Sequence, residues 1–458
     1  MLADLLQVVL YKLFMSPNAI KYTLACIADV AFPRVNFSVE MSPEPTIVVD
    51  GCIAIKFPVL TDENVEMLLN GKACYSEINS CDNKVKVKVF GLAEGKELFS
   101  LVDGDVVVNA DLLSVSFALL SRYEETRVSE RDKYGRFAYS DSLVKKYNII
   151  DIPIIDEYAL FLRKFVCDIF QSVSISPRKP RFIPTHDIDF LFRFSNFGKA
   201  VKAIAGDLLK RKSLSLSLKS LCDYVASRRN IERDPYVSGM LELLKVSVEH
   251  KLDSKFYFKA LSRGKDCSYN IFSGRTKRCI ERVISAGKSV GLHGGLDSYS
   301  SADVFASEKN NLQSVTNCEV DSSRQHFLRF DVHKTPQVWQ KCGIRHDSTL
   351  GFPEHEGFRC GTCHPYRLYD VDNDCVTDVV EHPLIAMDTT LFQYRNLTVD
   401  EAFASICHLY ERCVAVEGDF VLLWHNTTMF GELYSWYRNV YLRFINSLVE
   451  YCNQQTNL

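Results

Sequence analysis

The decapeptide RFIPTHDIDF, residues 181–190, places two carboxylates where they can act together. An apolar, strand-like segment ends here in a polar cluster, and successive side chains of an extended chain point to opposite faces. Asp187 and Asp189 are two positions apart, so we expect them on one side. Two carboxylates this close repel each other unless a cation or a shared proton intervenes. The spacing favours one carboxylate that holds a metal ion and a second that acts as a base toward water.

An Asp-x-Asp pair alone is more simply a solvated turn, so the interpretation depends on residues elsewhere in the chain. His293 lies in GLHGG, where the glycines allow a ligand to approach closely. Arg324 and His326 lie in SRQHF, and the alternation of a strand would put both on one face. His425 follows the apolar segment FVLLW and is suited to act as a general acid.

Three further residues are candidates for substrate binding. Asp347, like Asp388, is expected at the end of a strand, and either carboxylate could orient His425. Arg359 lies in the polar segment GFRCGTCHPY. Trp424 stands beside His425 and could stack on a sugar ring, although an aromatic residue in an apolar run is at least as often part of the core.

Composition and charge describe an ordinary globular protein of two or three domains, with 458 residues, 47% hydrophobic and 24% charged. The formal net charge of −3 argues against a general nucleic-acid binder. Sixteen cysteines are scattered, often within apolar runs, as expected for buried thiols in a reducing compartment. Residues 360–364, CGTCH, have the form of a c-type haem attachment motif, but no export signal accompanies them, so we expect thiols and no haem.

The first residues predict an amphipathic helix at about 2–14, because an acid at position 4 and the lack of a basic stretch do not fit a secretory signal. No run of about 18 apolar residues occurs, so we predict no transmembrane segment. We therefore expect a cytoplasmic protein.

Residues 1–173 are expected to form a smaller N-terminal α/β accessory domain without a catalytic constellation. Its predicted elements are a strand at Tyr22–Phe32, a hairpin at Pro45–Pro58 that turns at Asp50-Gly51, a strand at Lys84–Phe90, a helix at Leu112–Arg122 and a helix within Asp151–Val173.

The segment SISPRKPR, residues 174–181, is the best domain boundary, and a second domain is predicted over 174–458. Helical and strand-like segments alternate there, and polar residues follow successive strands, which is how a (β/α) barrel builds a site at its C-terminal rim. The sequence contains no G-x-G-x-x-G or Walker loop, so it gives no support to an open nucleotide-binding sheet. The predicted strands are Ser254–Ala260, Val290–Leu292, Gln325–Phe330, Gly343–His346, Leu384–Met387 and Phe420–Trp424.

A long helical insertion is expected at about 196–250, and it carries a cluster of basic residues. Leucines and isoleucines are interleaved with these residues at helical spacing, so a peripheral contact with an anionic membrane or an acidic glycan carrier is one interpretation. A solvated helix face is the simpler one. The basic cluster consists of Lys199, Lys202, Lys210, Arg211, Lys212, Lys219, Arg228 and Arg229.

Six motifs together resemble the bacterial polysaccharide deacetylases with a NodB-homology domain, which are similar to carbohydrate esterase family four. They occur in the order THDID, GLHGG, SRQH, HDSTLG, GFRCGT and LLWHN. In the first half, LLSRYEE and GRFAYSDSL resemble the N-terminal domain that accompanies one branch of that family. The resemblance implies a deformed (β/α) barrel and a divalent metal, usually zinc, held by one Asp and two His.

The resemblance also implies roles for single residues. Asp187 corresponds to the catalytic base, Asp189 to a metal ligand and His293 to the first histidine ligand. Arg324 corresponds to the arginine that orients the base, and His425 to the acid.

One position departs from the family pattern. The usual second histidine lies four residues after the first, and here that residue is Asp297. Either Asp297 or His326 completes the metal site; we favour His326 because imidazole suits zinc.

The expected function is metal-dependent removal of an acetyl group from an N- or O-acetylated sugar or glycan intermediate. Two alternatives remain open. One is a catalytically impaired glycan-binding protein on the same barrel, and the other is a hydrolase of a non-peptide C–N bond in a small cyclic amide.

Overall fold

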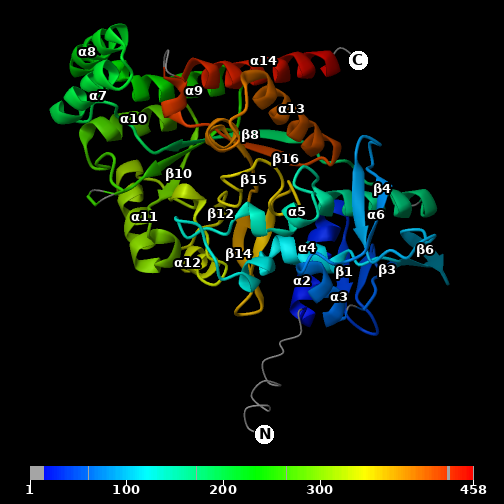
Figure 1. Ribbon diagram of the computed structural model, residues 1–458. Coiled ribbons are helices and arrows are strands. Elements are labelled where there is room, and N and C mark those ends of the chain that lie inside the picture. The colour runs from blue at the N-terminus through cyan, green and yellow to red at the C-terminus, as the bar shows by residue number, and fades with distance from the viewer. Residues whose placement is uncertain are drawn as a thin grey trace.

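A curled sheet of nine strands lies at the centre of the computed structural model, a mixed α/β structure (Figure 1). The structure describes residues 15–456, apart from residues 60, 172, 262, 265 and 431–433. The helix expected at about 2–14 lies outside the described residues. A five-stranded sheet and a two-stranded sheet lie in the N-terminal part, and the division into two domains at residue 173 stays a prediction.

The first described helix, α2 (Pro17–Ala31), replaces the strand predicted at Tyr22–Phe32. Its N-terminus is capped by Ser16, whose side chain accepts a hydrogen bond from the backbone N–H of Ala19, and Pro17 occupies the first turn. Leu24, Ile27 and Ala31 recur at helical spacing and are buried. The strand prediction was wrong because a short, nearly continuous apolar segment fits both periods.

The five-stranded sheet has the order β1-β2-β3-β7-β6. The hairpin predicted at Pro45–Pro58 is confirmed, with Asp50 (φ 49°) and Gly51 (φ 69°) in the left-handed conformation that a tight hairpin turn requires. The strands are β1 (Phe37–Glu40), β2 (Thr46–Val49), β3 (Ile53–Lys56), β6 (Phe99–Val102) and β7 (Asp105–Val108), and β4 (Tyr75–Asn79) pairs separately with β5 (Lys86–Phe90).

The helices of this part are α3 (Asp62–Leu69), α4 (Leu113–Leu120), α5 (Leu143–Lys146) and α6 (Ile154–Ile169). The helices predicted around α4 and α6 are therefore confirmed. Every residue of α4 is buried, because the helix lies in the core rather than on the surface.

The nine-stranded sheet has the order β13-β14-β12-β11-β10-β9-β8-β16-β15, and its strands are parallel except for β13 at one edge. Parallel strands bring their carboxyl ends to the same edge, where the polar residues of the sequence motifs gather. The strands are β8 (Arg181–Ile188), β9 (Lys255–Lys259), β10 (Ser289–Gly294), β11 (Ser322–Gln325), β12 (His346–Asp347), β13 (Tyr366–Asp370), β14 (Cys375–Glu381), β15 (Leu384–Met387) and β16 (Asp419–Leu423).

The sheet curls into a half-barrel rather than a barrel closed by strand pairing. Among the described residues, the two end strands β13 and β15 do not pair with each other. The loop after β12 lies in the gap, where the backbone N–H of Gly357 donates to the carbonyl oxygen of Ile385 in β15 at 2.8 Å. In place of the expected deformed barrel, the structure thus shows a curled, nine-stranded half-barrel.

The strand predicted at Gln325–Phe330 was placed too late in the sequence, because the observed strand covers Ser322–Gln325. The strand β11 ends at Gln325, and a 3-10 turn follows at His326–Leu328, with Phe327 (φ 60°) and Leu328 (φ 55°) in left-handed backbone conformations. His326 therefore does not share a strand face with Arg324; it leaves the sheet at the strand end.

Helices cover the curled sheet. The insertion predicted at 196–250 is helical, as expected, and its first two helices, α7 and α8, stand out at the upper left of Figure 1. In the described part, no helix combines the length and apolarity that a membrane crossing needs. The helices are α7 (Phe197–Leu209), α8 (Leu214–Arg229), α9 (Pro235–Glu249), α10 (Gly274–Ser285), α11 (Ala302–Thr316), α12 (Thr335–Lys341), α13 (Val399–Ala415) and α14 (Ser435–Thr456).

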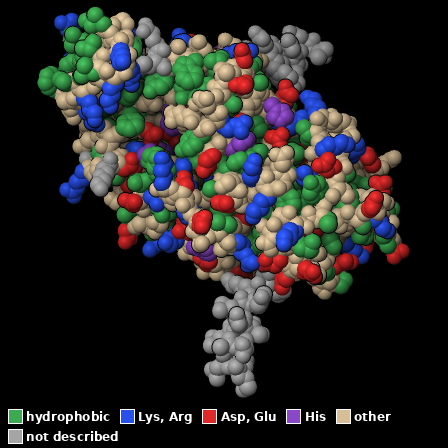
Figure 2. Space-filling model, in the orientation of Figure 1, with side chains coloured by type: hydrophobic (Ala, Val, Ile, Leu, Met, Phe, Trp, Pro, Cys, Tyr) green, Lys and Arg blue, Asp and Glu red, His purple; other side chains and the backbone are tan. Residues whose placement is uncertain are grey.

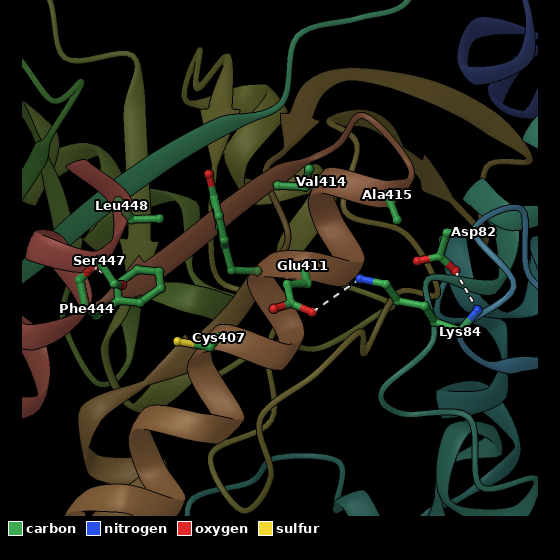
Figure 3. A pocket seen from close by; sticks show the side chains of 10 residues that line it. Asp82, Lys84, Cys407, Glu411, Val414, Ala415, Phe444, Ser447 and Leu448 are labelled. Carbon is green, nitrogen blue, oxygen red and sulfur yellow. Dashed lines mark hydrogen bonds and ion pairs between the residues drawn. The ribbon is translucent and has the colours of Figure 1, made fainter. Parts of the chain in front are cut away.

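The N-terminal part also contacts α13. A hollow of about 450 Å³ lies between α13, α14 and the loop that carries Asp82 and Lys84 (Figure 3). Lys84 lies 3.6 Å from Glu411 across this hollow, and Asp82 pairs with the buried Arg412. These ion pairs join the two-stranded sheet to the helices that cover the large sheet.

Candidate metal centre and active site

The carboxyl ends of four neighbouring strands place the candidate residues side by side. Asp187 lies in β8, and Asp189 is the first residue after its end. Lys259 of β9, His293 of β10 and Arg324 of β11 are register partners in adjacent strands. This is the edge at which a parallel sheet of this kind presents functional side chains.

Asp189, His293 and His326 form a potential metal site, because one ligand atom from each lies within 4.8 Å of the others. The Nε2 atoms of both histidines lie 3.1 Å from the same oxygen of Asp189, Oδ1. Burial opposes ionisation, but the neighbouring histidines hold the pKa of Asp189 well below its usual value. A charged carboxylate and two imidazole nitrogens are donors that a zinc-like ion accepts.

Hydrogen bonds at the outer nitrogens fix the direction of both imidazoles. His293 Nδ1 lies 3.0 Å from the carbonyl oxygen of Arg324, which can only accept, so Nδ1 carries the proton. His326 Nδ1 lies 3.0 Å from Oδ2 of Asp266 and donates in the same way. The Nε2 of each imidazole then faces the Asp189 carboxylate, as in histidine metal sites generally, and the Lys259 ammonium lies 3.3 Å from Nε2 of His326, where a bound cation would displace it. The residues fit a divalent metal.

A buried lysine lies next to this group. The Lys259 ammonium is 2.9 Å from Asp266 and 3.5 Å from Asp189. Burial opposes ionisation of Asp266, but His326 and Lys259 lower its pKa to about 2. Sequence reasoning missed both Lys259 and Asp266, because neither lies in a motif or at a recognisable spacing from one.

Asp187 is held by the predicted arginine. Arg324 Nη1 donates to Oδ1 of Asp187 at 3.2 Å and to the hydroxyl of Thr185 at 2.7 Å. The other side of the guanidinium is fixed by Ser348, through its carbonyl and its hydroxyl oxygen, each at 2.7 Å. Arg324 is completely buried, so it has one position and holds the Asp187 carboxylate in one orientation.

His425 is paired with Asp388 rather than with Asp347. Its Nδ1 lies 2.7 Å from Oδ1 of Asp388, and its backbone N–H donates to Oδ2 of the same carboxylate at 2.9 Å. Burial disfavours the protonated imidazole, but the charge of Asp388 and its hydrogen bond outweigh burial and raise the pKa of His425 to about 9. Its Nε2 is directed to the Asp189 side, 3.7 Å from Oδ2.

These residues share one cavity of about 140 Å³. Asp187, Asp189, His293, His326 and His425 all line it. The remaining lining includes apolar and aromatic side chains and one residue of the N-terminal part. Those that sequence reasoning missed include Arg136, Phe327, Leu328, Met387 and Tyr394.

Asp297, the alternative third ligand, lies outside the cluster. Its side chain is 86% exposed and faces Arg329 at 3.7 Å. Asp297 opens a 3-10 turn after β10 rather than continuing on the face of His293, because the segment does not become the helix that a four-residue spacing needs.

The predicted substrate-binding role of three residues does not agree with their positions in the structure. Arg359, Asp347 and Trp424 are buried, and none of them is among the described residues that line the cavity. The structure therefore places none of the three where it could contact a substrate in this cavity.

Each of the three has a partner inside the protein. Arg359 donates to Glu125 at 2.6 Å and so joins the N-terminal part to the loop after β12. Asp347 accepts from Ser323 at 2.5 Å, and burial raises its pKa. Trp424 packs against Tyr441, with ring centroids 5.3 Å apart. Polar type alone does not distinguish such buried pairs from a binding site.

Comparison with sequence families gives a match in the first part of the chain. Residues 15–171 match a sequence-family model described as "Family of unknown function (DUF7033)". No curated protein sequence matches the chain.

Solved structures with a similar fold include two proteins described as polysaccharide deacetylases and one allantoinase. The protein from Mycobacterium smegmatis is 16% identical, with a TM-score of 0.39, and the match covers 62% of this chain and 94% of that one. The Puue allantoinase is 12% identical (TM-score 0.37, 59% and 84% covered), and the Pseudomonas aeruginosa protein is 13% identical (TM-score 0.35, 59% and 84% covered). Similarities of this size leave the activity to be argued from the site itself.

Proposed function

We propose that this protein is a metal-dependent hydrolase that removes an acetyl group from an acetylated sugar or glycan intermediate. The supporting observation is one cavity in which a carboxylate–histidine–histidine donor set lies beside a second, arginine-held carboxylate and a carboxylate-paired histidine. These are the parts that hydrolysis of an acyl group needs: an electrophile, a base and an acid.

Each residue has a distinct proposed role. Asp189, His293 and His326 would hold the metal, which when bound supplies a Lewis acid, most simply zinc. Asp187 would take a proton from water, with Arg324 holding the carboxylate in place. His425 would donate a proton to the departing amine or alcohol.

The Asp388 carboxylate supports this role of His425. It fixes Nδ1 at 2.7 Å, and so turns Nε2 toward the cavity. It also stabilises the protonated ring that an acid requires.

One aromatic ring supports a carbohydrate substrate. Tyr394 lines the cavity and is partly exposed, unlike Trp424, so it offers a face on which a sugar ring can stack. The fifteen cysteines whose side chains the structure describes are free thiols, which supports a reducing compartment such as the cytoplasm.

The test combines metal analysis with acetate release from acetylated sugars. We expect about one equivalent of zinc or a similar ion in the purified protein. Asp189→Ala should lose the metal, whereas Asp187→Asn should keep it and lose acetate release. Asp297→Ala is the matched control and should retain both. Equal acetate release by the wild type and Asp187→Asn would contradict the proposal.

The small cavity favours one second candidate. A volume of about 140 Å³ also suits a small cyclic amide, whose non-peptide C–N bond the same groups could hydrolyse. Ring opening without acetate release, lost in Asp187→Asn, would select this alternative. Sugar binding without metal and without turnover would instead indicate a catalytically impaired glycan-binding protein.

A further inference from the structure

The hairpin of α7 and α8 has its polar and apolar faces reversed relative to an ordinary surface hairpin. In α8, Ser217 and Ser220 are 7% and 2% exposed, whereas Leu214 and Leu218 are 63% and 54% exposed. Surface helices normally turn leucines toward the protein and serines toward water. The sequence of α8 therefore exposes more apolar surface to water than an ordinary surface helix does.

The exposed apolar residues form a stripe along one face of each helix. In α8 they occupy positions 214, 218, 221 and 225, which recur every three or four residues and so lie on one face. In α7, Phe197, Val201 and Leu208 are four and seven residues apart, so they also lie on one face. Eight of the large hydrophobic side chains that are exposed among the described residues lie between Phe197 and Val225.

Polar contacts hold the two helices together on the inner side. Asp207 of α7 is completely buried and pairs with Arg193 at 2.9 Å and with Arg211, and it accepts from Ser220 of α8. Ser217 donates to the carbonyl oxygen of Ile204 at 3.1 Å. Because these contacts stabilise the hairpin without its leucines, the apolar stripes remain available to a partner.

Positive charge surrounds the stripes. All eight residues of the basic cluster are exposed, while the only acids between positions 196 and 230 are Asp207, which is buried, and Asp223, which faces Lys219 at 3.9 Å. Figure 2 shows hydrophobic and basic side chains gathered at the upper left, over α7 and α8. The whole chain carries a formal charge of −3, so the positive charge is local.

We propose that the α7–α8 hairpin binds the surface of an anionic lipid membrane. The apolar stripes would enter the interface between headgroups and acyl chains, and the basic cluster would contact lipid phosphates. A second copy of this chain fits less well, because it would bring the same excess of positive charge against itself. The hairpin begins shortly after Asp189, so binding keeps the active-site edge of β8 near the bilayer.

The test measures sedimentation of the full chain with phosphatidylcholine vesicles, with and without phosphatidylglycerol. We expect at least about tenfold stronger binding to the anionic vesicles, and we expect added salt to weaken it. The variant Leu218→Glu/Leu221→Glu should bind about tenfold more weakly. Lys212→Glu/Arg228→Glu/Arg229→Glu should bind anionic vesicles no better than neutral ones.

The matched control is Val248→Glu/Val304→Glu, which adds two charges at exposed apolar positions of α9 and α11 and should bind like the wild type. Circular dichroism checks that each variant is folded. Binding unaffected by Leu218→Glu/Leu221→Glu, or no binding to anionic vesicles, would overturn the proposal. So would a dimer in analytical ultracentrifugation that this variant abolishes, because the stripe would then belong to a second copy.

Discussion

Arg136 Nη1 donates a hydrogen bond to the carbonyl oxygen of Phe327 at 3.0 Å, and so joins residues 191 positions apart in the sequence. Tyr134 stacks on the same residue, with ring centroids 4.5 Å apart. Phe327 and Leu328 both have left-handed backbones, which cost a bulky residue about 1 kcal/mol or more each. The N-terminal part therefore holds a strained turn that directly follows His326.

Arg136→Ala is expected to weaken metal binding, because the turn after His326 loses the group that holds it. We expect the dissociation constant for zinc to rise roughly tenfold, as when a supporting contact of a metal ligand is lost. Competition with a chromophoric chelator measures this directly. Arg127→Ala, at an exposed arginine outside the cavity lining, should leave the affinity unchanged, and equal affinities of both variants would contradict the prediction.

Asp266→Asn should weaken metal binding for an electrostatic reason. The Asp266 carboxylate orients His326 at 3.0 Å and neutralises the buried Lys259 ammonium at 2.9 Å. Without its charge, a cation would bind beside an uncompensated positive group. Zinc affinity should fall about 10- to 100-fold in the same chelator assay. Asp297→Asn provides the control, and an unchanged affinity of Asp266→Asn would argue against metal binding at this site.

Asp388→Asn should impair turnover while leaving the metal in place. An amide can hold His425 Nδ1 but does not stabilise the protonated ring, so the acid becomes weaker. The proposed acetate release should fall about 10²- to 10⁴-fold in kcat. Metal content, measured on the same preparation, should match that of the wild type. A loss of metal in this variant would assign Asp388 a structural role instead.

His186 should make the folded state less stable in acid. It is completely buried, its Nδ1 lies 2.9 Å from the carbonyl oxygen of Trp424, and its ring packs against Phe256. Burial lowers the pKa of His186 to about 4, whereas the unfolded chain has about 6.5. Between these values only the unfolded chain binds the proton, so the free energy of unfolding is highest above about pH 6.5 and falls toward pH 4.

Urea unfolding at about pH 7.5 and pH 4.5 measures this effect. The loss attributable to His186 should reach up to about 3 kcal/mol, and His186→Gln should lose correspondingly less on acidification. His333→Gln, at an exposed histidine, should keep the pH dependence of the wild type. The same pH dependence in His186→Gln and the wild type would show that this residue is not the cause.

The residues at strand ends could be predicted because two simple rules determine their positions, namely the alternation of side chains along a strand and the common direction of parallel strands. Alternation within β8 and the common direction of parallel strands bring Asp187, Asp189 and His293 together, however far apart they are in sequence. His326 belongs to the metal site as predicted, but a 3-10 turn carries it and not the predicted strand. The preference for imidazole selected it over Asp297, while the turn that carries it was not foreseen.

The other parts of the cavity depend on contacts between distant segments, which a sequence does not display. Arg136 and Tyr394 are ordinary surface residue types in unremarkable contexts, and only packing places them at the mouth of the sheet. Conversely, Arg359 and Asp347 look reactive, but their partners are buried. The secondary-structure prediction was wrong at Tyr22–Phe32, where apolar residues are too frequent to distinguish the period of a helix from that of a strand.

The long separation between Arg136 and Phe327 has a consequence for biosynthesis. Arg136 emerges from the ribosome well before the turn that it holds, so the cavity wall cannot be complete until nearly three quarters of the polypeptide has been translated. Nascent chains that stop short of β11 would carry Asp189 and His293 without His326. Acquisition of the metal is thereby expected to be a late, post-assembly event rather than a nucleus for folding.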